Sequence, residues 1–344
     1  MKNIALSLIV LLFSIISALA NDSLAEMNTG GLVFVYSPNV EMVSEELYVS
    51  TKEIRVDYIF RNNSEKDIRS IVAFPMPDIT GDPYGEVAIP FPDEDNFLGF
   101  SVRINGQPVE VKLQQRVFAL EIDQTDLLIE ANIPLMPFAL ETTKRLELLP
   151  ASSQDRQNDN QVTLDKLVFL GLVENEVWDD GSGVKNYPVP IWTLKSTYWW
   201  EMSFPANAEI SVSHKYIPSV GGTTATFLIN PDGSKGESYD EYVKRYCVDK
   251  TFISAVKRGF ANNTSEYMAP FFENYISYIL KTAQNWYGNI DNFRLVVDKG
   301  STRNLVSFCG ENVKKIGPTT FEMRVEDFYP ENDLNILILV RNEE

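Results

Sequence analysis

The sequence predicts a mainly β protein, with an antiparallel β-sandwich in its N-terminal part and an α+β C-terminal part that contains two short helices. Three observations predict this class. Residues 54–60 and 192–204 alternate between apolar and polar side chains, as strands with one buried face do. Asn105-Gly106 joins two further alternating runs, which is typical of a tight hairpin. Beyond residue 220, apolar residues recur at helical spacing before short strand-like runs return.

The first twenty residues have the composition of a secretory signal peptide. Lys2 precedes a mostly apolar run over Ile4–Ile16, and Ala18-Leu19-Ala20 has the small-x-small pattern that signal peptidase accepts. We expect cleavage after Ala20 and a periplasmic or secreted protein. The alternative, an uncleaved membrane anchor, needs about 18 or more apolar residues and different flanks. No cysteine directly follows the run, which argues against a lipid-anchored lipoprotein. No later apolar run is long enough to span a bilayer.

After the signal peptide we expect two parts, a β-sandwich over residues 21–220 and an α+β part over residues 221–344. In the first part, residues 54–60 and 71–74 predict two strands connected by a turn. A short helix is predicted near Thr125, with Asp123 or Thr125 itself as its cap. The polar, unpatterned residues 151–161 are predicted as a loop rather than a domain boundary.

The segment WTLKSTYWWEMSFP, residues 192–205, is predicted as part of a long strand over residues 190–204. Its even-numbered positions are almost wholly apolar: Trp192, Leu194, Ser196, Tyr198, Trp200, Met202 and Phe204. Its odd-numbered positions are almost all polar: Thr193, Lys195, Thr197, Trp199, Glu201 and Ser203. We therefore expect Trp192 and Trp200 in the core and Trp199 on the solvent-facing side. Residues 209–217 are expected to pair with this strand across the turn that follows it.

Two short helices are predicted near residues 238–258. Ser238 and Glu241 have the spacing of a capping box at the start of the first helix. Asp249 is the expected cap of the second helix, and Gly259 is its expected stop. A strand is expected from Tyr275, and further strands are expected in residues 293–297, 305–309, 321–328 and 334–340.

The two cysteines, Cys247 and Cys309, are the only ones in the chain. In an oxidising compartment two cysteines most simply form one disulfide, and we expect this pair to do so. The alternative is a reactive thiol, although the absence of a C-x-x-C motif argues against a thioredoxin-type site.

The charge of the chain excludes some partners. The sequence has 48 acidic and 30 basic residues, a net charge of −18. Such a chain repels nucleic acid and anionic lipid, so neither is expected as a partner. Solubility is the simplest reason for the charge, and cation binding is the alternative. The clusters Asp93–Asp95 and Asp179–Asp180 could hold calcium, but neither matches a twelve-residue calcium loop. We predict no metal site and no cofactor.

The sequence contains few of the motifs that catalysis requires. His214 is the only histidine, which excludes multi-histidine zinc sites and H-E-x-x-H proteases. No G-x-S-x-G motif presents a serine, and no phosphate-binding loop is present. Because His214 falls on the apolar face of its strand, we expect a hydrogen-bonded core or edge histidine rather than a catalytic base. With 48 acidic residues, the sequence neither reveals nor excludes a glycosidase-type carboxylate pair.

A series of blocks gives the chain a resemblance to a known family. In order they read "NDS" from Asn21, "VDYIFRNNSEKD", "VAFPMPDI", "NFLGFSVRINGQPV", "DQTDLLIEANIPLMP", "PIWTLKSTYWWEMSFPA", "HKYIPSVGG", "YILKTAQNWYGNI" and "LVSFCG". The chain resembles, almost throughout, the exported bacterial family known as domain of unknown function 4424. One position departs: the family has glycine where this chain has Ala283. The resemblance implies an exported, single-chain, β-rich protein, and it implies no reaction, cofactor or catalytic residue.

The function expected from these observations is binding rather than catalysis. We expect a periplasmic or secreted binding or interaction protein whose partner is an envelope or extracellular protein, a peptide or a glycan. A candidate site lies near Trp199, His214 and Trp286, with Trp199 stacking against a sugar or peptide group; the alternative for Trp199 is packing. The alternative function is an extracytoplasmic hydrolase that uses a carboxylate pair or His214.

Overall fold

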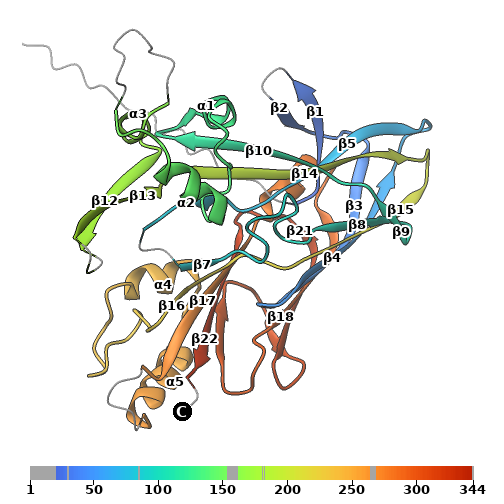
Figure 1. Ribbon diagram of the computed structural model, residues 1–344. Coiled ribbons are helices and arrows are strands. Elements are labelled where there is room, and N and C mark those ends of the chain that lie inside the picture. The colour runs from blue at the N-terminus through green and yellow to red at the C-terminus, as the bar shows by residue number, and fades with distance from the viewer. Residues whose placement is uncertain are drawn as a thin grey trace, which may run out of the picture.

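The computed structural model describes residues 21–28, 31–83, 86–152, 162–179, 181, 183–263 and 269–342. The predicted signal peptide, most of the polar segment 151–161 and Asp180 therefore lie outside the described residues. The described chain is mainly β, as predicted, and its strands form three large sheets and one separate hairpin (Figure 1). We call the large sheets A, B and C.

Neighbouring strands in each sheet are hydrogen-bonded in the following order. Sheet A runs β11 (Ile122–Asp123), β10 (Lys112–Ala119), β14 (Thr193–Phe204), β5 (Ile68–Pro75), β1 (Ser23–Asn28) and β2 (Gly31–Val35), with β6 (Ile79–Thr80) also on β14. Sheet B runs β20 (Lys314–Lys315), β21 (Thr320–Phe328), β18 (Ile290–Asp298), β3 (Val40–Val49), β4 (Ile54–Asn62), β15 (Glu209–Tyr216), β8 (Ser101–Ile104) and β9 (Gln107–Val109). Sheet C runs β19 (Leu305–Phe308), β22 (Leu334–Arg341), β17 (Phe271–Tyr278), β16 (Val220–Thr223) and β7 (Glu86–Ala88). The separate hairpin is β12 (Val173–Asp179) and β13 (Val184–Pro190).

Strand β14 has the two faces that its alternation predicts. All of its even-numbered side chains are buried, and its odd-numbered side chains are partly or fully exposed. Trp192 precedes the strand, is fully buried and donates a hydrogen bond from Nε1 to the Leu135 carbonyl at 2.8 Å. The hairpin at Asn105-Gly106 is also confirmed, because both residues have positive φ between β8 and β9.

The predicted pairing of residues 209–217 with the aromatic strand is wrong. Both edges of β14 are occupied, one by β10 and the other by β5. Strand β15 instead crosses to sheet B, where it lies between β4 and β8. The residues between the two strands thus form a corner between two sheets rather than a hairpin turn, and the apolar faces of the strands meet across the core.

The three predicted helices are present, but most of their predicted ends are wrong. The helices of the structure are α1 (Thr125–Glu130), α2 (Leu140–Glu147), α3 (Leu164–Phe169), α4 (Tyr239–Arg245) and α5 (Lys250–Ala261), with a 3₁₀ turn η1 (Lys281–Asn285). Helix α1, for example, has Gln124 at its N-cap position instead of Asp123 or Thr125. Asp249 caps α5 as predicted, accepting a hydrogen bond from the Phe252 amide at 2.7 Å. The predicted capping box of α4 is wrong: Ser238 has ψ of 13°, not the extended value that lets a cap side chain reach back to the helix, and it makes no cap hydrogen bond.

Two other boundaries differ from prediction. Helix α5 continues through Gly259 to Ala261. A Cβ on Gly259 would lie 2.2 Å from the Phe271 ring, so this glycine permits close helix–strand packing and does not stop the helix. Strand β17 begins at Phe271, earlier than the predicted Tyr275.

The two predicted parts of the chain share structure. Strand β18, which follows residue 220, pairs in parallel with β3, which precedes it. The main hydrophobic core likewise contains residues from both parts. A smaller second core lies between sheet C and helices α4 and α5. That residues before and after 220 form two separate domains stays a prediction.

Among the described residues, no helix is both long and apolar enough to cross a membrane.

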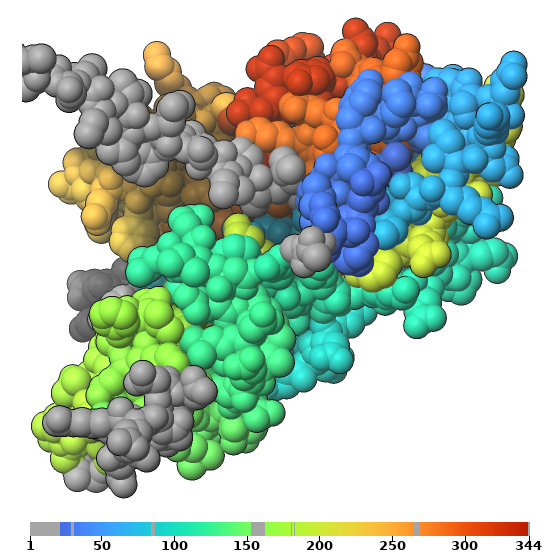
Figure 2. Space-filling model, turned by 90° about the horizontal axis from the view of Figure 1, so that it is seen from above, coloured from blue at the N-terminus to red at the C-terminus, as the bar shows by residue number. Residues whose placement is uncertain are grey.

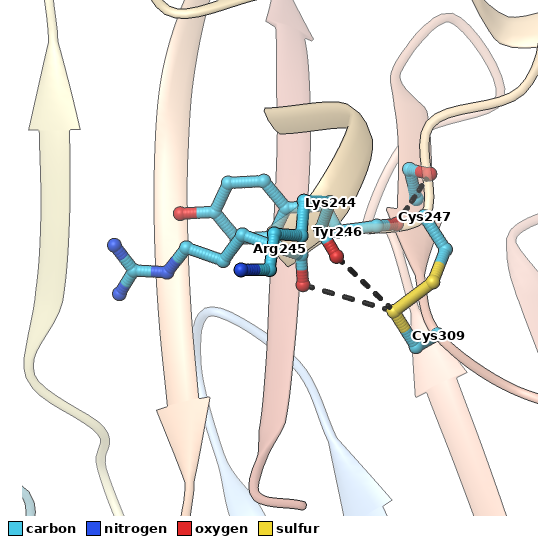
Figure 3. The surroundings of a disulfide bond; sticks show 6 residues. Lys244, Arg245, Tyr246, Cys247 and Cys309 are labelled. Atoms are coloured by element: carbon cyan, nitrogen blue, oxygen red, sulfur yellow. Dashed lines mark hydrogen bonds between the residues drawn. A yellow bond between two sulfur atoms is a disulfide. The ribbon is translucent and has the colours of Figure 1, made fainter. Parts of the chain in front are cut away.

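Cys247 and Cys309 form a disulfide that ties the end of α4 to the end of β19 (Figure 3). Cys247 follows the last turn of α4 with φ of 52°, the left-handed conformation in which helices often end. Cys309 Sγ lies 4.0 and 3.8 Å from the carbonyl oxygens of Lys244 and Arg245. The bridge therefore fixes the helix C-terminus against sheet C.

Removing the disulfide is expected to lower the free energy of unfolding by about 2–4 kcal/mol, because the bridge joins residues 62 positions apart in the unfolded chain. Urea denaturation of the oxidised protein and of a Cys247→Ala/Cys309→Ala variant measures the loss. Reductant serves as the control, since it should destabilise the parent protein and leave the variant unchanged. Equal midpoints, or two free thiols by mass spectrometry, would contradict this expectation.

Candidate functional site

His214 and Trp286 meet at the N-terminal segment of the described chain. His214, on β15, places Nε2 2.9 Å from Asp22 Oδ1. Trp286, just after η1, donates from Nε1 to the Asp22 carbonyl at 2.6 Å. Both side chains are only 1% exposed. The structure therefore brings these two predicted site residues together, around a residue that the sequence did not connect with them.

Aromatic rings surround the His214 imidazole. The rings of Phe74, Phe100 and Trp200 have centroids 5.2, 5.4 and 5.1 Å from it. Burial raises the pKa of Asp22, although the adjacent His214 acts in the opposite direction. An imidazole enclosed in this way does not reach a substrate in solution, so this placement gives no support to a catalytic base.

A second carboxylate lies beside this pair. Asn21 donates from Nδ2 to Glu45 Oε2 at 3.0 Å, and Tyr58 donates its hydroxyl to Asn21 Oδ1. The Tyr58 and Tyr278 hydroxyls are 3.1 Å apart. Burial raises the pKa of Glu45 to about 8. We call this buried set the core polar cluster; its members are Asn21, Asp22, Glu45, Tyr58, His214 and Tyr278.

Trp199 lies away from the core polar cluster, on the outer face of sheet A. It is partly exposed, and its neighbours across the sheet are Ala73 on β5 and Lys112 on β10. The Lys112 ammonium lies 4.5 Å from the centre of the indole ring, which is within cation–π distance. Trp199 therefore does not join His214 and Trp286 in one site.

The two adjacent tryptophans of β14 are expected to differ strongly in their effect on stability. Trp200→Ala should lower the free energy of unfolding by about 3–5 kcal/mol, because it empties a fully buried position. Trp199→Ala should lower it by less than about 1 kcal/mol, since it removes one partly exposed cation–π contact. Urea denaturation of both variants measures the difference, and comparable losses would contradict the assignment of faces.

The acidic clusters do not gather into a metal site within the part of the chain that is described. No group of three or more histidine, cysteine, aspartate or glutamate side chains there could hold an ion. Asp179 Oδ1 accepts hydrogen bonds from the Gly181 and Gly183 amides at 2.9 and 3.0 Å. Asp93 Oδ1 accepts one from the Leu140 amide at 3.0 Å. Asp179 thus shapes a local turn, whereas Asp93 ties its loop to the first residue of α2.

An open hollow lies over sheet C, where the parts of the chain before and after residue 220 meet. It is a cavity of about 780 Å³. We call it the sheet C cavity; its lining residues are Thr51, Val87, Ala88, Phe138, Val220, Gly222, Thr223, Thr224, Phe272, Glu273, Asn274 and Asn342. Ligand pockets commonly have about 300–1,000 Å³ and commonly lie between parts of a fold.

Glycine forms part of the floor of the sheet C cavity. A Cβ on Gly222 would lie only 2.9 Å from the Glu273 carbonyl oxygen and 3.4 Å from Asn274 Oδ1. Any larger residue would push the adjacent strand or fill the hollow. The signal for this position was present in the sequence as Gly221-Gly222 inside a strand, which marks a close approach of backbone.

A buried carboxylate holds the neighbouring loop in place. Glu273 Oε1 accepts from Thr226 Oγ1 at 2.7 Å and from the Phe227 amide at 2.9 Å. Glu273 Oε2 accepts from the hydroxyls of Tyr242 at 2.7 Å and of Tyr275. Burial raises the pKa of both tyrosines, so they remain neutral donors. Helix α4, β17 and the loop after β16 are thereby joined at one point.

The side chains that line the sheet C cavity are uncharged, with Glu273 as the one acidic residue. Its carboxylate is occupied by donors from β16, the loop that follows, α4 and β17, so its main chain is what borders the hollow. Phe138 and Phe272 supply aromatic rings, and Asn274 supplies an amide. The lining therefore combines apolar surface with neutral hydrogen-bonding groups.

Comparison with known proteins finds a matching family and distant likenesses among solved structures. The sequence model of the family described as "Domain of unknown function (DUF4424)" matches residues 20–337. No curated protein matches the sequence. A crystal structure from Legionella pneumophila, described as a "putative nutrient binding protein", is 14% identical, covering 93% of this chain and 70% of that chain with a TM-score of 0.45. A likeness at this level carries no argument about function.

Proposed function

The chain belongs to the family described as Domain of unknown function (DUF4424), and we propose that it acts through binding, as an exported protein. The ligand occupies the sheet C cavity. The export part rests on the signal-peptide pattern of residues 1–20 and on the disulfide, which is typical of oxidising compartments.

The lining of the sheet C cavity is the observation that carries this proposal. Its polar groups are threonine hydroxyls and asparagine amides, and its apolar groups include two phenylalanine rings. Such a lining favours a small, uncharged ligand with one apolar and one polar face, because a charged ligand would lose hydration without gaining an opposite charge. A neutral sugar is the ligand class that fits this chemistry best.

The outer face around Trp199 is the other place where a sugar or peptide could stack. Trp199 is partly exposed and already faces the Lys112 ammonium. It lies on a sheet rather than in a hollow, so it would bury less of a small ligand than the sheet C cavity does. The outer face around Trp199 is therefore the alternative location. Variants at each of the two sites distinguish it from the sheet C cavity.

The test is calorimetric titration of the mature protein with neutral mono- and disaccharides, an acidic sugar and short peptides. Ala88→Phe places a ring in the sheet C cavity from an exposed position on β7. We expect saturable binding of a neutral sugar that Ala88→Phe abolishes and Asn274→Ala weakens about tenfold or more. Trp199→Ala is the matched control and should leave the affinity unchanged.

Two results would overturn the proposal. One is the absence of measurable heat or thermal stabilisation with every ligand class. The other is binding that persists in Ala88→Phe and disappears in Trp199→Ala, which would move the site to the outer face of sheet A.

A further inference from the structure

The residues just after the predicted cleavage site lie in the core instead of at the surface. Asn21, Asp22 and Ser23 are each 0% exposed. Chain ends usually lie at the surface and are poorly ordered unless something holds them. From Glu26 onward the chain emerges, and hairpin β1–β2 (blue in Figure 2) forms part of the surface beside the orange and red C-terminal strands.

The core polar cluster holds this segment through all three large sheets. Asp22 contacts His214 of sheet B. Asn21 bridges Tyr58 and Glu45, both of sheet B, and Tyr58 in turn contacts Tyr278 of sheet C. Ser23 begins β1 of sheet A and accepts a hydrogen bond from Asn285 Nδ2 at 2.9 Å. The segment 21–23 therefore lies where the sheets converge.

The two carboxyl groups of the core polar cluster are not equally partnered. It contains two carboxylates, Asp22 and Glu45, and one imidazole, which is paired with Asp22. Glu45 Oε1 is buried without a hydrogen-bond partner, and no cationic side chain of the described residues acts on Glu45. A buried carboxylate is strongly unfavourable unless it is paired.

Cleavage after Ala20 would create a cation beside this carboxylate. A new α-ammonium on Asn21 belongs to the residue whose side-chain amide already contacts Glu45 at 3.0 Å. It is thus separated from the carboxylate by no more than about one side-chain length. An α-amino group has an ordinary pKa near 8 and is cationic at neutral pH.

We propose that the α-ammonium of Asn21, released by removal of the signal peptide, is a structural cation that pairs with Glu45 in the core. The inference rests on the export part of the proposed function. Before cleavage the position holds a neutral peptide nitrogen, and Glu45 is unpaired. After cleavage, Asp22 keeps His214 as its partner and Glu45 gains the ammonium, so processing stabilises the mature fold.

The pH dependence of stability follows from the same groups. Glu45 faces the Asn21 amide, Asp22, and the hydroxyls of Tyr58 and Tyr278; His214 lies beyond Asp22. With a neutral nitrogen at position 21, burial raises the pKa of Glu45 from 4.5 to about 8. The folded state then holds this proton more tightly than the unfolded state, so stability falls as pH rises from 4.5 towards 8. An adjacent ammonium lowers that pKa and flattens the decline.

The experiment compares two chains, one that begins at Asn21 and one that retains Leu19-Ala20, each with Glu45 and with Glu45→Gln. Glutamine keeps the shape of the side chain and an oxygen for the Asn21 amide. At pH 7 we expect the mature chain to have a folded-to-unfolded ratio about tenfold or more above that of the extended chain. Glu45→Gln should abolish this advantage of the mature chain, because it removes the unpaired carboxylate of the extended chain and leaves the ammonium of the mature chain without its partner.

A second readout does not depend on the stability of any variant. The α-amine of the folded mature chain should react slowly with an acylating reagent and rapidly after unfolding, whereas that of the extended chain should react rapidly in both states. Equal stability of the two chains, a difference that survives Glu45→Gln, or a fully reactive amine would overturn the proposal. A mass of the exported protein that places its first residue elsewhere would also overturn the proposal. That result would leave the proposal of ligand binding in the sheet C cavity standing.

Discussion

Asp22→Ala is expected to lower the free energy of unfolding by about 3–5 kcal/mol. The substitution removes one partner of a buried pair and leaves the His214 imidazole without its hydrogen bond in a fully enclosed position. His214→Phe should cost a similar amount, because the ring fills the aromatic enclosure but leaves the buried Asp22 carboxyl group unpaired. The double variant should lose less than the sum of the single losses, since each single change leaves an unpaired polar group.

Urea denaturation with a double-mutant cycle measures this coupling. Asp78→Ala is the control, because its carboxylate pairs with Lys195 at the partly exposed outer face of sheet A. Such a surface pair contributes about 1 kcal/mol or less. Losses of similar size for Asp22→Ala and Asp78→Ala would contradict a structural role for the core polar cluster.

Glu273→Ala is expected to lower the free energy of unfolding by about 4 kcal/mol or more. Hydrogen bonds to a charged group contribute about 1.5–3 kcal/mol each, and this carboxylate accepts several at once. The amide of Phe227 cannot reorient, so it would be left without a partner. Because the loop after β16 borders the sheet C cavity, ligand affinity should fall together with stability.

Glu201→Ala is the matched control, since Glu201 is an exposed glutamate on β14. It should change the free energy of unfolding by less than about 0.5 kcal/mol. Thermal and urea denaturation of both variants, followed by titration with the best ligand, give the comparison. A Glu273→Ala protein with unchanged stability would show that the loop is held in some other way.

Local sequence pattern was sufficient to predict which face of a strand is buried, but not which strands pair with one another. The alternation of residues 192–204 predicted which tryptophans are buried, because side-chain direction in a strand has a strict period of two. The pairing of β15 failed because pairing depends on which strand edges are free in the folded protein. The edges of β14 were occupied by strands that lie about 80 and 130 residues earlier, which alternation alone does not reveal.

Local sequence pattern also could not show which residues meet in the core polar cluster and in the sheet C cavity. His214 was predicted on an apolar face, yet its partner Asp22 lies 192 residues away. Nothing local to "NDS" indicates that these residues enter the core, since polar residues near a chain end are ordinarily exposed. The sheet C cavity is formed by residues from 51 to 342, and its one local sign was the pair of glycines inside β16.

Hydrogen–deuterium exchange of the mature protein, with and without its best uncharged ligand, tests the central claim most directly. We predict that ligand slows exchange in residues 220–227 and 271–275, which border the sheet C cavity, and leaves residues 112–118 and 193–199 unchanged. Protection confined to the outer face of sheet A around Trp199, or no protection at any ligand concentration, would contradict binding in the sheet C cavity.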